Sequence, residues 1–294
     1  MTALRDILVV LDDSPASETR LAIAIALAQQ HNAYLTGLST LELLTPARSV
    51  VQPRGTLETD APPEAALLNW GAARPSEYPD ADTQLAETAE RIETAFRERL
   101  RLSSVAGEWR VASGRISEAV VRQARHGDLI ILGQVDPSHP PPANRHLVED
   151  VLLTSGRPTL VVPYIGQFRT VGTNILVAWN SGREAARAVH DAIPLLARAA
   201  SVTLLVVSPR GQEIATDEAD LIDHLARHGI HAKADRTVAP DISVSDTLLS
   251  YAADVSADLL VAGGYGHSRL RERLLGSITH DLLQHVTLPV LLSH

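Results

Sequence analysis

The sequence of 294 residues contains no cysteine and few aromatic residues, with two Phe, three Trp and five Tyr. The lack of cysteine excludes thiolate catalysis, disulfide bonds and cysteine-rich zinc sites, and it fits a reducing compartment. No apolar run approaches the roughly 18–20 residues of a membrane-spanning helix, and the N-terminus leads directly into an apolar strand. We therefore expect a cytoplasmic protein without a membrane partner.

An excess of basic residues is also lacking. The chain has 26 Lys and Arg against 35 Asp and Glu, a formal net charge of -9, and the basic residues are scattered. Proteins that follow a nucleic-acid backbone gather Lys and Arg to neutralise its phosphates, so nucleic acid is excluded as a main partner. Most of the 45% hydrophobic residues are instead Ala, Leu, Val and Ile, which is typical of parallel sheets covered by helices.

The chain contains an internal repeat. Asp6–Ser14 (DILVVLDDS) reads as a short apolar strand closed by turn formers, and Asn174–Gly182 (NILVAWNSG) repeats this pattern. The clearest correspondence joins Gly127–Gly133 (GDLIILG) to Ala257–Gly263 (ADLLVAG). The sequence therefore consists of two copies of one unit.

Within each copy, aliphatic strands alternate with helical segments, which favours right-handed βαβ units and a mostly parallel sheet. We predict an α/β fold of two tandem three-layer sandwiches, with domains at 1–165 and 171–294. The further expected strands are Tyr34–Leu38, Trp109–Ala112, Arg157–Val162, Val202–Val207, Lys233–Val238 and Leu288–Leu292. The expected helices include Ala16–Gln30, Ala81–Leu102, Ile116–Arg125, Ala185–Ala199 and Val244–Val255.

One segment breaks the symmetry. Leu44–Asp80 is rich in Pro, Ala and Gly and has no counterpart in the second copy. A long irregular insertion in a compact domain is usually functional or disordered. Two interpretations stay open, a partly ordered surface excursion and a dedicated binding element, and the sequence does not assign its role.

Residues 258–279 carry the chemistry. A strand is expected to end in a tight glycine turn, and a helix to begin about ten residues later. Glycine lets a backbone approach a phosphate closely, and a helix start supplies free N–H groups and the positive end of the helix dipole. The residues of this pattern are Gly263, Gly264, Gly266, Gly276, Ser277 and Thr279.

This spacing resembles that of nucleotide-binding members of the universal stress protein family, which carry Gly, two residues, Gly, nine residues, then Gly followed by Ser or Thr. Here Gly263, Gly266, Gly276 and Ser277 stand at those positions. The resemblance covers nearly the whole chain outside Leu44–Asp80, as a tandem member with Rossmann-like halves. It implies a cytoplasmic stress-response protein that binds ATP, with or without Mg²⁺, through its second half and acts as a sensor or interaction module.

The resemblance also implies which residues contact ATP. The phosphates would rest on the glycine turn and the helix start, and adenine between the ends of the first two strands of the second copy. The family's acidic residue on the base side falls on Asn180, whose amide leaves adenine selectivity open; the alternative is a plain strand-to-helix turn. The expected ligand contacts are Asn180, Val207, Gly263, Gly264, Gly266, His267, Gly276, Ser277, Ile278 and Thr279.

The first copy departs from the motif. Asp136 takes the place of Gly266, and Arg145 and His146 take the places of the later Gly-Ser pair. An acidic side chain and bulky residues oppose phosphate binding by repulsion and by blocking the backbone. We expect one nucleotide site per chain, with Asp12 and Asp13 of the first copy serving as a turn and helix cap.

No catalytic or metal-ligating residues are predicted. His224 and His228 have helical spacing, but no His-Glu-x-x-His pattern accompanies them, so we interpret them as a solvated helix face. Two alternatives to a binding module remain open. One is a slow ATPase or phosphotransferase with His267 or Ser277 near the γ-phosphate, and the other is a nucleotide-free interaction scaffold.

The sequence does not identify a protein partner. Family resemblance implies that the two copies pack through their last strands, Thr159–Val162 and Val290–Leu292, whose exposed edges need covering. We therefore expect an intramolecular pseudo-dimer, and homodimerisation of the whole chain stays open.

Overall fold

The computed structural model describes residues 3–40, 79–112, 115–137, 146–209, 217–239, 243–266 and 278–294. The first half runs through β1 (Asp6–Val10), α1 (Ala16–His31), β2 (Tyr34–Thr40), α3 (Pro79–Ser103), β3 (Gly107–Ala112), α4 (Ile116–Ala124), β4 (Leu129–Gly133), α5 (Leu147–Thr154) and β5 (Thr159–Val162). The second half runs through β6 (Asn174–Ala178), α6 (Arg183–Leu196), β7 (Ser201–Pro209), α7 (Glu218–Arg227), β8 (Ala232–Ala239), α8 (Val244–Asp254), β9 (Leu259–Gly263), α10 (Ile278–His285) and β10 (Val290–Ser293). Both halves alternate strands and helices, so the predicted α/β fold is confirmed.

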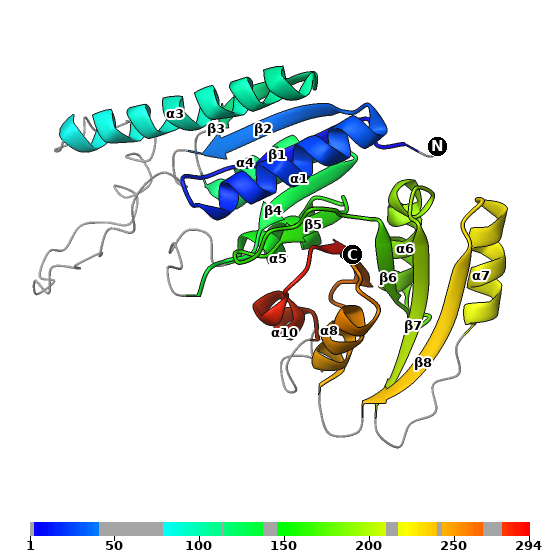
Figure 1. The fold of residues 1–294 in the computed structure, drawn as a ribbon. Helices are drawn as coiled ribbons and strands as arrows, with labels where there is room; N and C mark the ends of the chain where they lie inside the picture. Colours follow the sequence, from blue (N-terminus) through cyan, green and yellow to red (C-terminus); the bar gives the residue numbers. More distant parts are fainter. Residues whose placement is uncertain are drawn as a thin grey trace, which may run out of the picture.

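The described strands form one ten-stranded sheet in the order β3-β2-β1-β4-β5-β10-β9-β6-β7-β8 (Figure 1). Pairing within each half is parallel. The halves meet where β5 and β10 pair antiparallel, with Leu160 opposite Leu291. The expected contact between the two last strands is therefore confirmed, and each strand covers the other's edge.

Side chains alternate along each strand between two helical layers. In β1, Ile7 and Val9 join the buried cluster that includes residues of α1, α3, α6 and α7. Leu8 and Val10 join the cluster that includes residues of α4, α5, α8 and α10. Because both faces of the sheet are covered by helices, the strands are aliphatic throughout rather than alternately polar.

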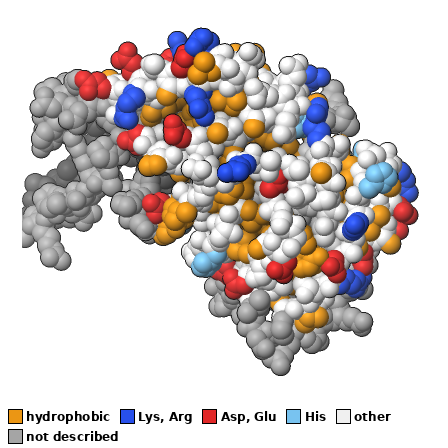
Figure 2. Space-filling model, in the orientation of Figure 1, with side chains coloured by type: hydrophobic (Ala, Val, Ile, Leu, Met, Phe, Trp, Pro, Cys, Tyr) orange, Lys and Arg blue, Asp and Glu red, His pale blue; other side chains and the backbone are white. Residues whose placement is uncertain are grey.

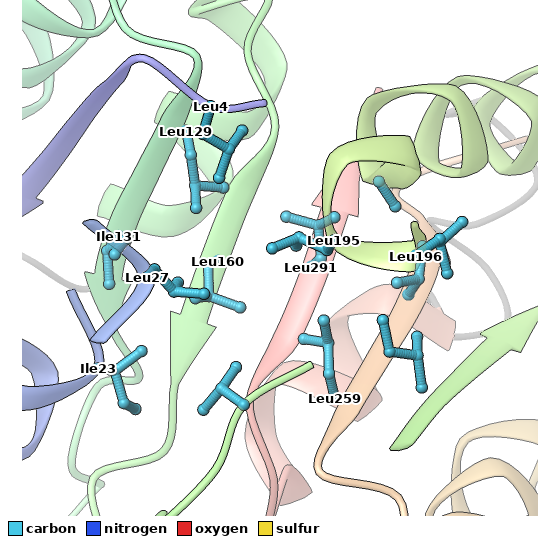
Figure 3. Packing of buried hydrophobic residues seen from close by; sticks show 14 of the residues in the cluster. Leu4, Ile23, Leu27, Leu129, Ile131, Leu160, Leu195, Leu196, Leu259 and Leu291 are labelled. Atoms are coloured by element: carbon cyan, nitrogen blue, oxygen red, sulfur yellow. The ribbon is translucent and has the colours of Figure 1, made fainter. Parts of the chain in front are cut away.

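The apolar core continues across the junction of the halves. Leu27 of α1, Leu160 of β5, Leu291 of β10 and Leu195 of α6 are all at most 3% exposed and belong to one cluster (Figure 3). Burying a leucine side chain contributes about 1.5–3 kcal/mol, so the shared core holds the halves together. The domain boundaries at 165 and 171 stay a prediction, because sheet and core both continue across them.

Some element boundaries differ from those expected. α3 begins at Pro79, inside the insertion predicted to end at Asp80, and most of that insertion lies outside the described residues. α6 begins at Arg183 rather than Ala185, because Gly182 is the last residue with an extended backbone before the helix. Across the described ranges, no helix combines the length and the apolar character needed to cross a membrane.

Charges of both signs are interspersed on the face of the molecule shown in Figure 2. Lys and Arg lie among Asp, Glu and apolar side chains on this face, without a field of one sign. Interspersed charges of opposite sign cancel most of each other's electric field.

Candidate nucleotide site

The strand β9 ends at Gly263, and the chain continues through Gly264, Tyr265 and Gly266 at the carboxyl edge of the sheet. Gly263 has no room for a side chain, because a Cβ there would lie 2.5 Å from the backbone nitrogen of Ala185 in α6. Glycine allows this close approach of strand and helix. The glycine that ends β9 is therefore required by packing, whatever the turn binds.

Hydrogen bonds hold this turn on two sides. The Gly264 N–H donates to the Ser293 carbonyl of β10 at 2.8 Å, and the Tyr265 N–H donates to the Thr279 hydroxyl oxygen of α10 at 2.9 Å. Tyr265 has a left-handed backbone (φ 53°), which costs about 1–2 kcal/mol in a residue with a side chain. The bond from Thr279 stabilises that conformation and brings together the two ends of the sequence motif.

The open side of the turn offers one backbone donor. Within the described part of the chain, no group accepts from the Gly266 N–H. α10 begins beside the turn at Ile278, which is 50% exposed, and a helix start favours an anion through its free N–H groups and dipole. His267, Gly276 and Ser277 of the predicted set lie outside the described residues.

An acidic side chain outside the predicted set lies beside the turn. A Cβ on Gly266 would lie 2.8 Å from Oε2 of Glu184, in the first turn of α6. Burial raises the pKa of Glu184, but its own backbone N–H, Arg183 and His294 outweigh this effect, and the net pKa is lowered. The ionised carboxylate places a negative charge where a phosphate would approach. No sequence signal pointed to Glu184, because it precedes the helix that was expected to begin at Ala185.

Asn180 follows β6 and makes a local turn. Its Oδ1 accepts from the Gly182 N–H at 2.9 Å, with Ser181 between them in a left-handed conformation (φ 55°). The strand-to-helix turn considered from the sequence is therefore present, and it uses the amide oxygen. Val207 lies in the neighbouring strand β7 and is 9% exposed, so its side chain offers little surface to a base.

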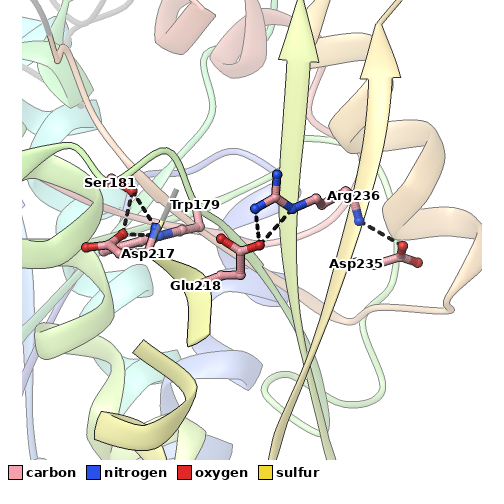
Figure 4. A network of polar contacts seen from close by, with 6 residues as sticks. All are labelled: Trp179, Ser181, Asp217, Glu218, Asp235 and Arg236. Carbon is pink, nitrogen blue, oxygen red and sulfur yellow. Dashed lines mark hydrogen bonds and ion pairs between the residues drawn. The ribbon is translucent and has the colours of Figure 1, made fainter. Parts of the chain in front are cut away.

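A polar network lies between the end of β6 and the start of α7 (Figure 4). Asp217 accepts from the Ser181 hydroxyl at 2.5 Å and from the Trp179 indole N–H at 3.1 Å. The Ser181 bond is the strongest influence on the pKa of Asp217 and lowers it, so this carboxylate is ionised. Nearby, Glu218 accepts from Arg236 of β8 (Nε to Oε1, 2.7 Å). Asp217 lies 36 residues after Ser181, too far for a short motif to join them.

In the first half, an arginine fills the equivalent edge of the sheet. A Cβ on Gly133, which ends β4, would fall on the guanidinium of Arg20, a residue that is 5% exposed. This guanidinium lies 2.9 Å from Oδ1 of Asp12 and donates to the Ser17 hydroxyl oxygen at 3.0 Å. Burial raises the pKa of Asp12, but Arg20 and Ser14 lower it by more, so the pair is charged.

Of the turn and the helix cap expected for Asp12 and Asp13, only the turn is present. Oδ1 of Asp12 accepts from the Ser14 N–H at 3.0 Å, which is the expected turn. The expected helix cap is wrong, because Pro15 precedes α1 and no side chain caps that helix. Asp136 and His146 are among the described residues, and Arg145 lies outside them.

Comparison with known proteins identifies the second half. Residues 173–294 match the Universal stress protein family, and no curated protein sequence matches the chain. The structure is similar to a universal stress protein from Archaeoglobus fulgidus, with 15% identity, a TM-score of 0.70, and coverage of 98% of this chain and 97% of that one. A functionally unknown protein from Pseudomonas aeruginosa is similar at 17% identity and a TM-score of 0.57, covering 99% and 93%.

At these identities the likeness of structure shows a shared fold across both halves. The family match covers the segment from the start of β6 through β10, which includes the glycine turn and α10. Residues 173–294 therefore form a universal stress protein family domain.

Proposed function

We propose that the second half binds ATP and that the chain acts as a nucleotide-dependent sensor or interaction module in a stress response. The proposal is carried by the Gly264–Gly266 turn, which Thr279 holds beside the start of α10. The Gly266 N–H, together with the N–H groups of a helix start, is suited to bind phosphate oxygens. The family match supports the same assignment, because the matched residues contain the whole glycine motif.

Glu184 sets a condition on this ligand. Its carboxylate and a phosphate on the turn would repel each other, so we expect ATP to bind as its magnesium complex. Mg²⁺ is commonly held by one or two carboxylates together with substrate phosphates and water. The described residues contain no group of three or more acidic or histidine side chains that could hold a metal alone. The phosphates, with Glu184 as the one protein carboxylate, would supply the ligands.

The base would lie at the ends of β6 and β7, beside Asn180 and the Val207 backbone. Because the Gly182 N–H already uses the Asn180 oxygen, the base contacts are weaker than the phosphate contacts. We expect modest discrimination between ATP and GTP.

Isothermal titration with MgATP tests the proposal. The wild-type protein should bind, and Gly266→Ala should weaken binding by about tenfold or more, because its methyl group obstructs the approach to the turn. Gly127→Ala is the matched control, since a Cβ there meets only ordinary contacts at 3.6 Å. Glu184→Gln should reduce the dependence on Mg²⁺. Absence of heat at millimolar MgATP in the wild-type protein would contradict nucleotide binding.

A nucleotide-free interaction scaffold is the second candidate. It is favoured by the Glu184 carboxylate beside Gly266 and by the packing that requires Gly263 without a ligand. Mass spectrometry of denatured, freshly purified protein separates the two functions. Co-purified nucleotide supports the binding module, whereas its absence together with a silent titration supports the scaffold.

A further inference from the structure

The glycine turn of the second half rests on a helix of the first half. A Cβ on Gly264 would lie 2.6 Å from Cδ2 of Leu152, a residue of α5 that is 1% exposed. The amide of Gln134, which follows β4, donates to the carbonyls of Leu283 and Gln284 in α10, at 2.9 and 3.1 Å. Both parts of the candidate site, the turn and α10, therefore contact the first half.

The carboxylate of Glu149 adds a charged contact at the same place. Glu149 lies in the first turn of α5, with His146 of its own half at 2.9 Å and His280 of α10 at 3.1 Å. Burial raises the pKa of Glu149, but His146, His280 and the Tyr265 hydroxyl outweigh this effect and lower it. The Glu149 carboxylate therefore joins α5 to α10, while Leu152 of the same helix packs against the turn.

The residues of the second half that lie near Glu149 belong to the sequence motif or follow it directly. Tyr265 stands between Gly264 and Gly266, and His280 follows Thr279, whose hydroxyl fixes the Tyr265 N–H. Glu149 of the first half thus contacts α10 at the residue after Thr279, whose hydroxyl holds the turn. Partly buried, charge-assisted contacts of this kind restrict the geometry of the groups that they join.

We propose that Glu149 is a positioning residue for the nucleotide site, so that the first half shapes the site in the second half. This inference rests on the proposed binding of ATP. By linkage, a ligand that needs the positioned turn must in turn stabilise the contact with α5. The first half is then a working part of the binding site even though it binds no nucleotide.

The test compares Glu149→Gln with Asp150→Asn in the full chain. Asp150 is the next residue of α5, is exposed, and lies in the same first turn, so both variants remove one charge from the same helix start. Titration with MgATP should show about threefold to tenfold weaker binding for Glu149→Gln and no change for Asp150→Asn. Hydrogen exchange gives a second readout, in which MgATP should protect the amides of residues 147–154 in the wild-type protein and in Asp150→Asn, and less in Glu149→Gln.

His280→Gln tests the same contact from the other side and keeps the inference open to refutation if Glu149→Gln fails to fold. Its loss of affinity should not add to that of Glu149→Gln in the double variant. Equal affinity of all variants for MgATP, with α5 unprotected, would overturn the positioning role while leaving nucleotide binding intact. A wild-type protein that binds no MgATP would instead overturn the proposed function, and the inference with it.

Discussion

Gly133 and Gly263 end equivalent strands in the two halves, yet their neighbours differ. A side chain at Gly263 would meet the backbone of α6, whereas one at Gly133 would meet the guanidinium of Arg20. In the first half the space above the strand end is occupied by the buried Arg20, which forms an ion pair with the partly exposed Asp12. In the second half the helix itself closes on the strand. The glycine at the end of the strand therefore makes room for the Arg20 side chain in the first half and for direct helix–strand packing in the second.

The difference between the neighbours of Gly133 and Gly263 depends on one pair of equivalent residues, which the hydrogen bonds of the strands identify. The Leu11 N–H donates to the Leu38 carbonyl as the Trp179 N–H donates to Leu205, so Leu11 and Trp179 are equivalent. Nine residues further along, Arg20 is equivalent to Ala188. A long cation fills the edge of the first half, and a methyl group leaves the second helix free to approach. The edge of the sheet is thus filled by one side chain in the first half and by close helix packing in the second.

The largest expected difference between the halves is at Asp12 and its equivalent Asn180. Asp12→Ala leaves the Arg20 charge buried without its partner, and we expect it to lower the free energy of unfolding by about 3 kcal/mol. Asn180→Ala removes one exposed turn bond and should cost about 1 kcal/mol or less. Urea unfolding followed by circular dichroism measures both. Equal losses would mean that the Arg20–Asp12 pair is not the structural centre of the first half.

The two glycines provide a second comparison. Gly263→Ala drives a methyl group against the backbone of α6, and we expect a loss of about 2–3 kcal/mol in the free energy of unfolding. Gly133→Ala displaces the end of the Arg20 side chain, which can move, and should cost about 1 kcal/mol. The same urea titration compares the two variants. A larger loss at Gly133 would reverse the assignment of the rigid neighbour.

A smaller difference concerns the ends of α1 and α6. His31 is 2% exposed, and burial, aided by Arg198 of the second half, lowers its pKa to about 4, whereas the equivalent residue of the second half is Ala199. Because the unfolded chain binds a proton there below pH 6.5 and the folded chain does not, stability falls as the pH falls. Between pH 7 and pH 5 this loss is about 2 kcal/mol.

His31→Gln should remove that part of the pH dependence of the free energy of unfolding, measured by urea unfolding at both pH values. His126→Gln, at an exposed position, should keep the wild-type dependence. If His31→Gln keeps it as well, protonation of His31 does not limit stability in mild acid.

Much of the fold could be predicted from the sequence, because the aliphatic strands and their repetition leave few arrangements open. The segments Gly127–Gly133 and Ala257–Gly263 predicted equivalent strands, and the structure places β4 and β9 there. The start of α6 was predicted two residues too late, since Arg183 and Glu184 have no apolar signal of their own. Helix ends are set by single hydrogen bonds, which periodicity does not record.

For the candidate site, the sequence predicted the residues of the local motif but not the contacts that residues far apart in the chain make with it. The motif indicated Gly263, Gly264, Gly266, Gly276, Ser277 and Thr279. Gly276 and Ser277 lie outside the described residues, and Thr279 does contact the turn. It gave no sign of Glu184 beside Gly266, because that approach depends on how closely α6 packs on β9. The contacts between the first half and the site could not be predicted either. Glu149 lies near α10 only because β5 pairs with β10 and brings the two halves together.

The antiparallel pairing of β5 with β10 also removes a dependence on concentration. Association of two separate copies would depend on the protein concentration. Two copies in one chain instead have an effective concentration of about a millimolar for each other. The assembled state then persists on dilution, and the two partners need not be identical. Each half is then free to diverge in sequence, so that equivalent positions can carry residues as different as Arg20 and Ala188.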